Sequence, residues 1–402
     1  MMIINNTKGA PRKPLGLYIH IPFCMKKCNY CDFLSFVGVP QEQSDAYFQT
    51  LLQEIDYFSE DYRNIYYVDT VFIGGGTPSL IDSSYISKLM DAVRTGFEVD
   101  KNAEISIETN PKTVTKDKLK EYLNLGINRL SMGAQSCDDE LLRYLGRVHT
   151  TDDFIKNYIS ARECGFKNIN IDLIFGIPGQ TLAVWKYTLN QVIGLCPEHI
   201  SFYSLQLEEG TKFYSMLQKG TLTETDEKLD RSMYSYAIKL LSKSGYVHYE
   251  ISNAAKNGYQ CRHNLKYWSM EDYLGLGLGA HSFIEGTRFS NVISLEQYVN
   301  IGKEYKYKQK KMTDESISPF SCWQHHNTKE DNISDYLITV MRKTQGIQFD
   351  DFKNRFGIGL EQLYGNVLRK YQNQGLIEIS ADRVYFTEKG MDLANIFLAE
   401  FV

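Results

Sequence analysis

Three cysteines, Cys24, Cys28 and Cys31, lie within eight residues and follow a strand-like apolar run, residues 17–23. Three thiolates at this spacing on one short loop can hold three corners of a cubane iron–sulfur cluster, and no fourth cysteine lies nearby. The fourth iron would then be open to a ligand, whereas a cluster with four protein thiolates usually only carries electrons. The spacing therefore predicts a [4Fe-4S] cluster that supports chemistry or substrate binding.

The alternative for this loop is a structural zinc site with His20 as the fourth ligand. Structural zinc sites usually pair two short Cys/His hooks, and no second hook follows downstream. A disulfide framework is disfavoured because the other five cysteines are scattered without a pattern. They are expected to be free thiols: Cys137, Cys164, Cys196, Cys261 and Cys322.

Composition excludes some classes of function. The chain has 402 residues and a formal net charge of -5. It therefore lacks the overall basic field that would suggest a nucleic-acid partner. No apolar run approaches the ~18 residues that a membrane-spanning helix needs. These features, with the absence of a signal-peptide pattern at the start, predict a cytoplasmic protein without a transmembrane segment.

Short β-rich runs alternate with amphipathic stretches up to about residue 250, which predicts repeated βα units and a parallel sheet. The expected strands are residues 17–21, 70–73, 104–108, 129–132, 168–175 and 199–205. The expected helices include residues 45–58, 85–95, 116–125 and 184–195. Six such units predict an α/β fold with a partial (β/α)6 barrel that is open along its side.

Polar or glycine-bearing motifs follow nearly every expected strand. The cysteine loop follows the first and a glycine loop, residues 74–78, follows the second, while Glu108, Gln135, Asp172 and Ser204 come from the later ones. Ligand-binding loops of βα barrels gather at the carboxyl ends of the strands. We therefore expect one shared site, in which three successive glycines allow close backbone approach to a ligand or simply form a tight turn.

The sequence predicts three segments. Residues 1–290 form the barrel, residues 291–332 a linker or extension, and residues 333–402 a small winged-helix-like domain with a hairpin at residues 377–386. From residue 331 onward there are eight Lys or Arg residues and ten Asp or Glu residues. This domain is therefore expected to pack on the barrel and not to read DNA.

The cysteine loop joined to a glycine loop after the next strand resembles the radical S-adenosylmethionine superfamily. In that family the amino and carboxylate groups of S-adenosylmethionine chelate the open iron, and an electron from the cluster cleaves the sulfonium. Residues 18–24, 74–78, 131–136 and 172–180 together resemble, more closely, the branch that contains the HemW-type haem chaperones and the oxygen-independent coproporphyrinogen III oxidases. The resemblance covers nearly the whole chain.

The resemblance implies a set of cofactor contacts. Cys24, Cys28 and Cys31 would hold the cluster, and Tyr30 matches an aromatic residue found between the second and third ligands. The S-adenosylmethionine contacts would fall on Tyr18, Gly75, Gly76, Thr77, Glu108, Gln135, Arg147, Asp172 and Ser204. Their carboxylate, amide and guanidinium groups suit a zwitterionic, ribose-bearing ligand.

Two features favour the chaperones within this branch. The oxidases carry a further cysteine where this chain has Phe33, and residues 263–268 resemble the His-Asn-x-x-Tyr-Trp signature of the chaperones. Haem iron commonly binds imidazole, so His263 is a candidate ligand, and Tyr267 and Trp268 could stack on the porphyrin. A hydrogen-bonded structural role for His263 is the alternative, and Cys261 and His281 also stay open as iron ligands.

The sequence thus predicts a haem chaperone that binds haem, a [4Fe-4S] cluster and S-adenosylmethionine and transfers haem to acceptor haemoproteins. The resemblance implies that the cluster supports haem transfer or homodimer formation, and no catalytic residue is assigned. The alternative function is that of an oxygen-independent coproporphyrinogen III oxidase, which decarboxylates the propionates of its porphyrinogen substrate by hydrogen abstraction.

Overall fold

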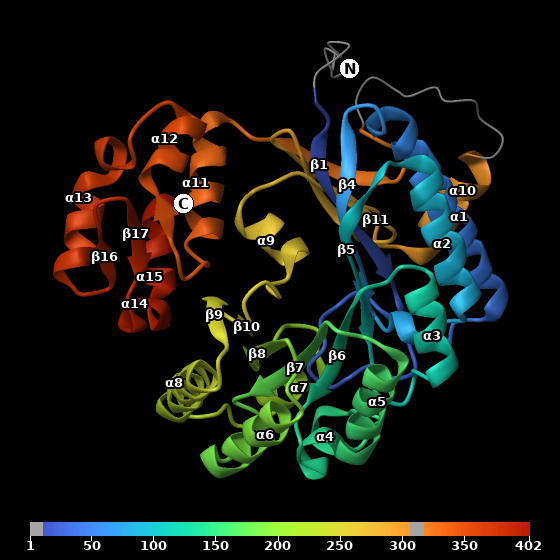
Figure 1. Cartoon of the computed structure of the whole chain (residues 1–402), viewed down its shortest axis with the longest axis horizontal. Coiled ribbons are helices and arrows are strands. Elements are labelled where there is room, and N and C mark those ends of the chain that lie inside the picture. Colours follow the sequence, from blue (N-terminus) through green and yellow to red (C-terminus); the bar gives the residue numbers. More distant parts are fainter. Residues whose placement is uncertain (1–10, 306–316) are drawn as a thin grey trace.

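The computed structural model describes residues 11–305 and 317–402 and is built on one large mixed sheet. All six predicted strands are present, and they lie side by side in chain order and run parallel (Figure 1). They are β1 (Lys13–Ile21), β4 (Tyr66–Gly75), β5 (Val99–Thr109), β6 (Arg129–Gln135), β7 (Ile169–Phe175) and β8 (His199–Ser204). The predicted partial α/β barrel is confirmed.

Most of the helices that follow these strands cover the outer face of the sheet (Figure 1). They are α1 (Gln41–Tyr62), α2 (Ser83–Gly96), α3 (Lys116–Asn124), α4 (Asp139–Leu145), α5 (Thr151–Cys164), α6 (Leu182–Gly194), α7 (Lys212–Gln218) and α8 (Glu227–Lys243), with the 3-10 turn η1 (Pro78–Leu80) before α2. Several begin at a side chain that accepts a backbone N–H, as Thr150 does in a capping box at α5. The four predicted helices fall on α1, α2, α3 and α6.

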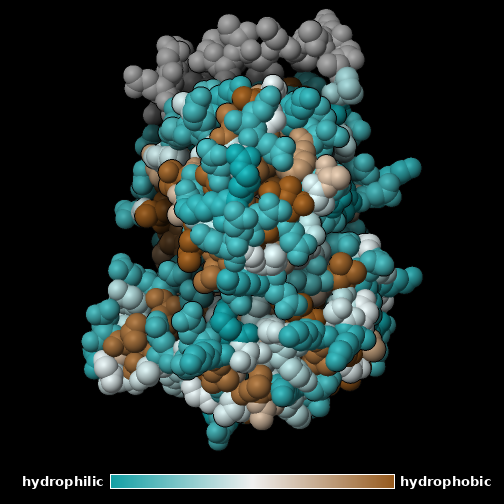
Figure 2. Space-filling model, turned by 90° about the vertical axis from the view of Figure 1, so that its left-hand side faces the viewer, coloured by the Kyte–Doolittle hydropathy of each residue, from teal (hydrophilic) through white to brown (hydrophobic). Residues whose placement is uncertain are grey.

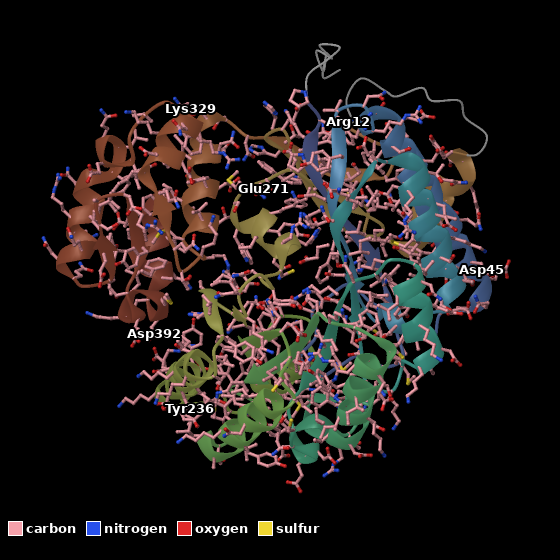
Figure 3. The ribbon with its side chains drawn as sticks, viewed as in Figure 1. Arg12, Asp45, Tyr236, Glu271, Lys329 and Asp392 are labelled. Carbon is pink, nitrogen blue, oxygen red and sulfur yellow. The ribbon has the colours of Figure 1, made fainter. Side chains whose placement is uncertain are left out.

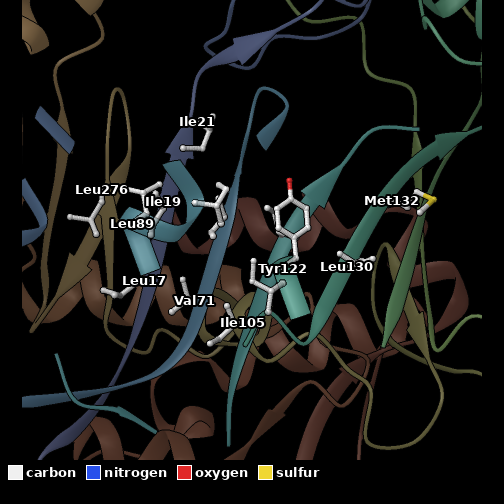
Figure 4. Packing of buried hydrophobic residues seen from close by; sticks show 14 of the residues in the cluster. Leu17, Ile19, Ile21, Val71, Leu89, Ile105, Tyr122, Leu130, Met132 and Leu276 are labelled. Atoms are coloured by element: carbon white, nitrogen blue, oxygen red, sulfur yellow. The ribbon is translucent and has the colours of Figure 1, made fainter. Parts of the chain in front are cut away.

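Along each strand, residues that face the helices alternate with residues that face the inside of the barrel. In β1, Leu17, Ile19 and Ile21 are fully buried and belong to the core between sheet and helices, together with Leu89 of α2 (Figure 4). Neighbouring positions such as Tyr18 on β1 face the other way, because successive side chains of a strand point to opposite faces. These inward-facing residues line the inside of the barrel and carry the polar groups.

The sheet extends beyond the six strands at both edges. β11 (Tyr273–Leu276) is a seventh parallel strand beside β1, and β12 (His281–Ile284), β13 (Thr287–Asn291) and β14 (Ser321–His326) continue from it in antiparallel order. At the opposite edge, β8 pairs with β10 (Asn253–Ala255), which pairs with β9 (Val247–Glu250). The short helix α9 (Arg262–Trp268) lies between the barrel and the C-terminal domain (Figure 1).

The described part of segment 291–332 extends the barrel. Helix α10 (Leu295–Tyr305) packs on α1, and β14 pairs with β13. Residues 306–316 of this segment lie outside the described residues. The barrel fold thus continues past residue 290 on both sides of that gap.

The C-terminal domain has its own apolar core and a three-stranded sheet. Its elements are α11 (Lys329–Val340), β15 (Ile347–Gln348), α12 (Phe349–Phe356), α13 (Leu360–Asn373), β16 (Ile377–Ile379), β17 (Arg383–Phe386), α14 (Glu388–Asp392), α15 (Ala394–Leu398) and η2 (Ala399–Phe401). The predicted hairpin is β16 and β17, which pair antiparallel with each other. β17 also pairs antiparallel with β15, which gives the expected winged-helix-like order.

This domain packs on the barrel through specific polar contacts. Arg355 donates hydrogen bonds to the carbonyls of Ser269 (2.9 Å) and Met270 (2.6 Å) just after α9. At the end of the domain nearest α8, Asp392 forms an ion pair with Arg231 at 3.1 Å (Figure 3). Its outer face is mainly hydrophilic, with apolar residues in separate small patches (Figure 2). No helix within the described ranges is both long and apolar enough to span a bilayer.

Candidate functional site

The three cysteines lie on one partly exposed loop that neighbouring elements hold in place. Cys24 ends β2 (Phe23–Cys24), which pairs with β3 (Phe36–Val37) on the far side of the loop. Midway, the Asn29 N–H donates to the carbonyl of Leu145 at 2.9 Å, and the Asn29 carbonyl accepts from the Phe213 N–H at 2.9 Å. The loop is therefore fixed by the C-terminus of α4 and the start of α7.

Two donors face the cysteine sulfurs. Thr77 Oγ1 lies 3.5 Å from Cys24 Sγ, and Arg147 Nη1 lies 3.6 Å from Cys28 Sγ. Hydrogen bonds of this kind tune the potential of thiolate-bound iron. The residues present therefore fit a thiolate-ligated cluster.

The zinc alternative fits less well. His20 is buried, and its two ring nitrogens lie within hydrogen-bond distance of the Tyr18 hydroxyl (3.1 Å) and the Leu34 carbonyl (2.9 Å). Among the residues that the structure describes, no three His, Cys, Asp or Glu side chains are grouped around one metal position. Because both ring nitrogens of His20 have partners within the protein, His20 is a poor candidate for a fourth ligand.

The glycine loop after β4 packs directly against the end of β1. The N–H groups of Gly76 and Thr77 donate to the carbonyls of Ile21 and Phe23, both at 2.8 Å. Gly75 has φ +111°, and a Cβ on it would lie 2.5 Å from the His20 ring. Packing against β1 therefore requires the glycine at position 75 and couples this loop to the cysteine loop.

Two partly buried carboxyl groups lie inside the barrel next to this loop. Glu108 accepts the Gly75 N–H at 2.9 Å, and Asp172 accepts the Ser131 hydroxyl at 3.0 Å. Burial, together with the charge of Asp172, raises the pKa of Glu108 to about 8, and burial also raises the pKa of Asp172. A ligand with a positive charge or hydroxyl donors would stabilise the ionised form of Glu108.

Arg147 and Gln135 complete the polar wall. Arg147 Nη2 donates to the carbonyl of Gly133 at 2.8 Å and also binds Asn110. Gln135 ends β6 with φ +64°, a conformation that is rare for a residue other than glycine and is often found at functional sites. The Arg147 side chain is thus held by two contacts within the protein.

These groups share one cavity of about 470 Å³, which lies within the range of small-molecule sites. Twelve of the predicted site residues line it: Cys24, Cys28, Tyr30, Cys31, Gly75, Gly76, Thr77, Glu108, Gln135, Arg147, Asp172 and Ser204. We call it the first cavity. The expectation that strand-end motifs converge on one site agrees with this geometry.

Two residues that the sequence analysis did not assign support this cavity. Asn110 lines it and donates from Nδ2 to Thr77 Oγ1 at 2.9 Å, which links the glycine loop to Arg147. Asp230 on α8 accepts a hydrogen bond of 2.5 Å from Ser204. Asn110 follows a predicted strand and could have been assigned by that rule, whereas no local pattern marks Asp230.

The other four predicted residues lie elsewhere. Tyr18, Tyr267 and Trp268 line a second cavity of about 460 Å³, between the inner side of the sheet and α11. His263 is buried, with Nδ1 2.9 Å from Thr70 Oγ1 and Nε2 2.8 Å from the Tyr267 hydroxyl. Burial lowers the pKa of His263 to about 3, so its ring is neutral and occupied by protein partners.

Comparison with known proteins identifies the class. A family model for the Radical SAM superfamily matches residues 18–192, the segment that contains the cysteine loop and most of the first cavity. A second model, for the HemN C-terminal domain, matches residues 327–393. The barrel is a radical S-adenosylmethionine domain, a family whose members bind a [4Fe-4S] cluster and S-adenosylmethionine.

Curated relatives narrow the assignment. The heme chaperone HemW of Bacillus subtilis is 36% identical over 96% of this chain and 98% of its own length, and that of Lactococcus lactis is 32% identical over 97% and 98%. The solved structure of coproporphyrinogen III oxidase (HemN) from Escherichia coli matches with a TM-score of 0.82 at 26% identity, over 98% of this chain and 91% of that chain. The chain belongs to the heme chaperone HemW family.

Proposed function

We propose that this protein is a cytoplasmic haem chaperone that binds haem, a [4Fe-4S] cluster and S-adenosylmethionine and transfers haem to acceptor haemoproteins. The observation that carries the proposal is the full-length similarity to proteins named heme chaperone HemW. The cytoplasmic assignment is supported by the cysteines, all eight of which are free thiols, as a reducing compartment would keep them.

The resident cofactors would occupy the first cavity. Cys24, Cys28 and Cys31 would hold the cluster, which when bound supplies an electron and an open coordination position. The carboxylates of Glu108 and Asp172 would face the positive charge and hydroxyl groups of S-adenosylmethionine, and Arg147 would face its carboxylate. The protein's part is to bind and orient this ligand beside the cysteine loop.

Haem transfer is tested directly with purified components. The full chain, reconstituted without oxygen and loaded with hemin, is expected to pass haem to an apo-haemoprotein, which is measured by the gain of the acceptor's own Soret spectrum. Hemin mixed with bovine serum albumin in place of the chaperone is the control for passive exchange. Failure to bind hemin, or transfer no faster than from albumin, would remove the proposal.

The oxidase is the second candidate, because the structural match to HemN spans almost the whole chain. Phe33 argues against it, since the oxidases carry a cysteine there that is linked to a second bound S-adenosylmethionine. We expect no protoporphyrinogen from coproporphyrinogen III in an anaerobic assay with reductant and S-adenosylmethionine. Product formation would reverse the order of the two candidates.

A proton release on ligand binding is expected from Glu108. With a pKa of about 8 in the free protein, this carboxyl is mostly protonated at pH 7, and a sulfonium ligand lowers its pKa. Binding of S-adenosylmethionine at pH 7 should therefore release a proton, and affinity should rise as the pH increases toward 8 and then level off. Titration calorimetry in buffers of different ionisation enthalpy measures this release.

Glu108→Gln is the control for that experiment. It keeps the shape of the side chain and removes the titration, so the buffer dependence of the binding enthalpy should disappear. Buffer dependence that persists unchanged in the variant would assign the proton to another group, with Asp172 the nearest alternative.

Homodimer formation is part of the proposal. Three exposed apolar side chains on or beside the cysteine loop support it: Met25, Phe33 and Val37. Sedimentation of the reconstituted and the cluster-free protein measures whether the dimer exists and whether it depends on the cluster.

A further inference from the structure

The second cavity is an apolar, aromatic-lined space at the junction of three parts of the chain. β1 contributes Tyr18, α9 contributes Tyr267 and Trp268, and α11 of the C-terminal domain contributes Thr339. Phe33 of the cysteine loop lines this cavity as well as the first. A flat aromatic ligand could therefore contact rings from several elements at once.

The charges in the two cavities differ in kind. The first is lined by charged side chains of both signs, which suit a zwitterionic ligand: Asp32, Glu108, Asp172, Glu208, Lys26, Lys27 and Arg147. Among the described residues that line the second cavity there is no Asp or Glu, and the one Lys or Arg is Arg288, which forms an ion pair with Asp335 at 2.7 Å. A large apolar ligand with negative substituents fits the second cavity better than the first.

His281 places an imidazole in this cavity. It begins β12, and because alternate residues of a strand share a face, it lies on the same side as Phe283, which also lines the cavity. His281 is exposed, and neither ring nitrogen has a hydrogen-bond partner among the residues described.

The two other candidate ligands are engaged in holding α9. The carboxylate of Glu104 on β5 accepts the N–H groups of Arg262 (3.0 Å) and His263 (3.1 Å), and Cys261 Sγ lies 3.6 Å away. Cys261 is fully buried, and both ring nitrogens of His263 are bonded within the protein. His263 thus holds the Tyr267 ring in place through the Tyr267 hydroxyl and is a positioning residue.

We propose that haem binds in the second cavity with His281 as the axial ligand of its iron, and with the rings of Tyr267, Trp268 and Tyr18 against the porphyrin. The site rests on the proposed haem-chaperone function. Its location places haem beside the cluster site, separated from it by Phe33.

The test compares hemin with iron-free protoporphyrin IX. With full-length protein, His281→Ala should weaken hemin binding at least tenfold and remove the imidazole-ligand signature from the visible and EPR spectra. Binding of protoporphyrin IX should change less than threefold, because the porphyrin still contacts the aromatic walls. Added imidazole should restore the spectrum of hemin bound to His281→Gly.

His325→Ala is the matched control, because His325 is exposed on β14 and is not among the residues that line the cavity. It should bind hemin like the wild type. His263→Ala should retain an imidazole-ligated spectrum, with an altered affinity for both hemin and protoporphyrin IX.

The outcomes separate the two levels of the proposal. A wild-type protein that does not bind hemin would remove the chaperone function itself. Wild-type binding with an unchanged spectrum in His281→Ala, or loss of the imidazole signature only in His263→Ala, would leave the function intact and overturn this site.

Discussion

Replacing Cys28 with alanine is expected to abolish assembly of the iron–sulfur cluster. Iron content after anaerobic reconstitution should fall from about four atoms per chain to near zero, because two thiolates on a half-exposed loop cannot retain a cubane. The fold should persist, since Cys28 is not part of the core and substitutions at such positions usually change the free energy of unfolding by less than about 0.5 kcal/mol. Iron and sulfide analysis, with circular dichroism for the fold, measures both.

Cys322→Ala provides the control for this experiment. Cys322 is also a free, exposed thiol, but it lies on β14, away from the cysteine loop. Its removal should leave the iron content unchanged. Full cluster content in Cys28→Ala, or equal loss in both variants, would contradict the assignment of the three ligands.

Gly75→Ala is expected to have the second large effect, this time on both stability and cluster assembly. Alanine at φ +111° costs about 1–2 kcal/mol in backbone strain, and its Cβ would lie 2.5 Å from the His20 ring. His20 would have to move and give up its hydrogen bond to the Leu34 carbonyl, which helps to fix the cysteine loop. We expect the free energy of unfolding of the cluster-free protein to fall by about 3 kcal/mol or more.

Gly245→Ala separates strain from the steric clash. Gly245 has φ +85°, but no atom lies within 4 Å of the position that its Cβ would take. This variant should lose only the strain contribution, about 1–2 kcal/mol, and should assemble the cluster normally. Equal destabilisation in the two variants, measured by urea unfolding, would mean that packing against His20 is not what requires Gly75.

The barrel could be predicted because core residues and inward-facing residues alternate clearly along its strands. Leu17, Ile19 and Ile21 pack on helices while the residues between them face inward, a pattern that sequence shows directly. β11 was not predicted from the sequence, because a strand of four residues that contains Gly275 gives only a weak strand pattern. The segment is instead held by distant contacts, such as the N–H of Gly277 donating to buried Glu54 at 2.8 Å.

The first cavity could be predicted because the ends of the strands could be located in the sequence. A rule about strand ends places Glu108, Gln135 and Asp172 together, without any knowledge of the distances between them. Tyr18 was assigned to the S-adenosylmethionine contacts by family resemblance and not by this rule, and it lines the second cavity. For His263, a local signature cannot distinguish an open imidazole from one bonded to Thr70 and Tyr267.

Phe33 has a consequence for how the two cavities communicate. Its side chain is 62% exposed and lines both of them, so one ring conformation sets the shape of both spaces. A ligand that shifted this ring in one cavity would therefore change the affinity of the other cavity for its own ligand. By thermodynamic reciprocity, the second ligand would then alter the affinity for the first by the same factor, and Phe33 would couple the two sites.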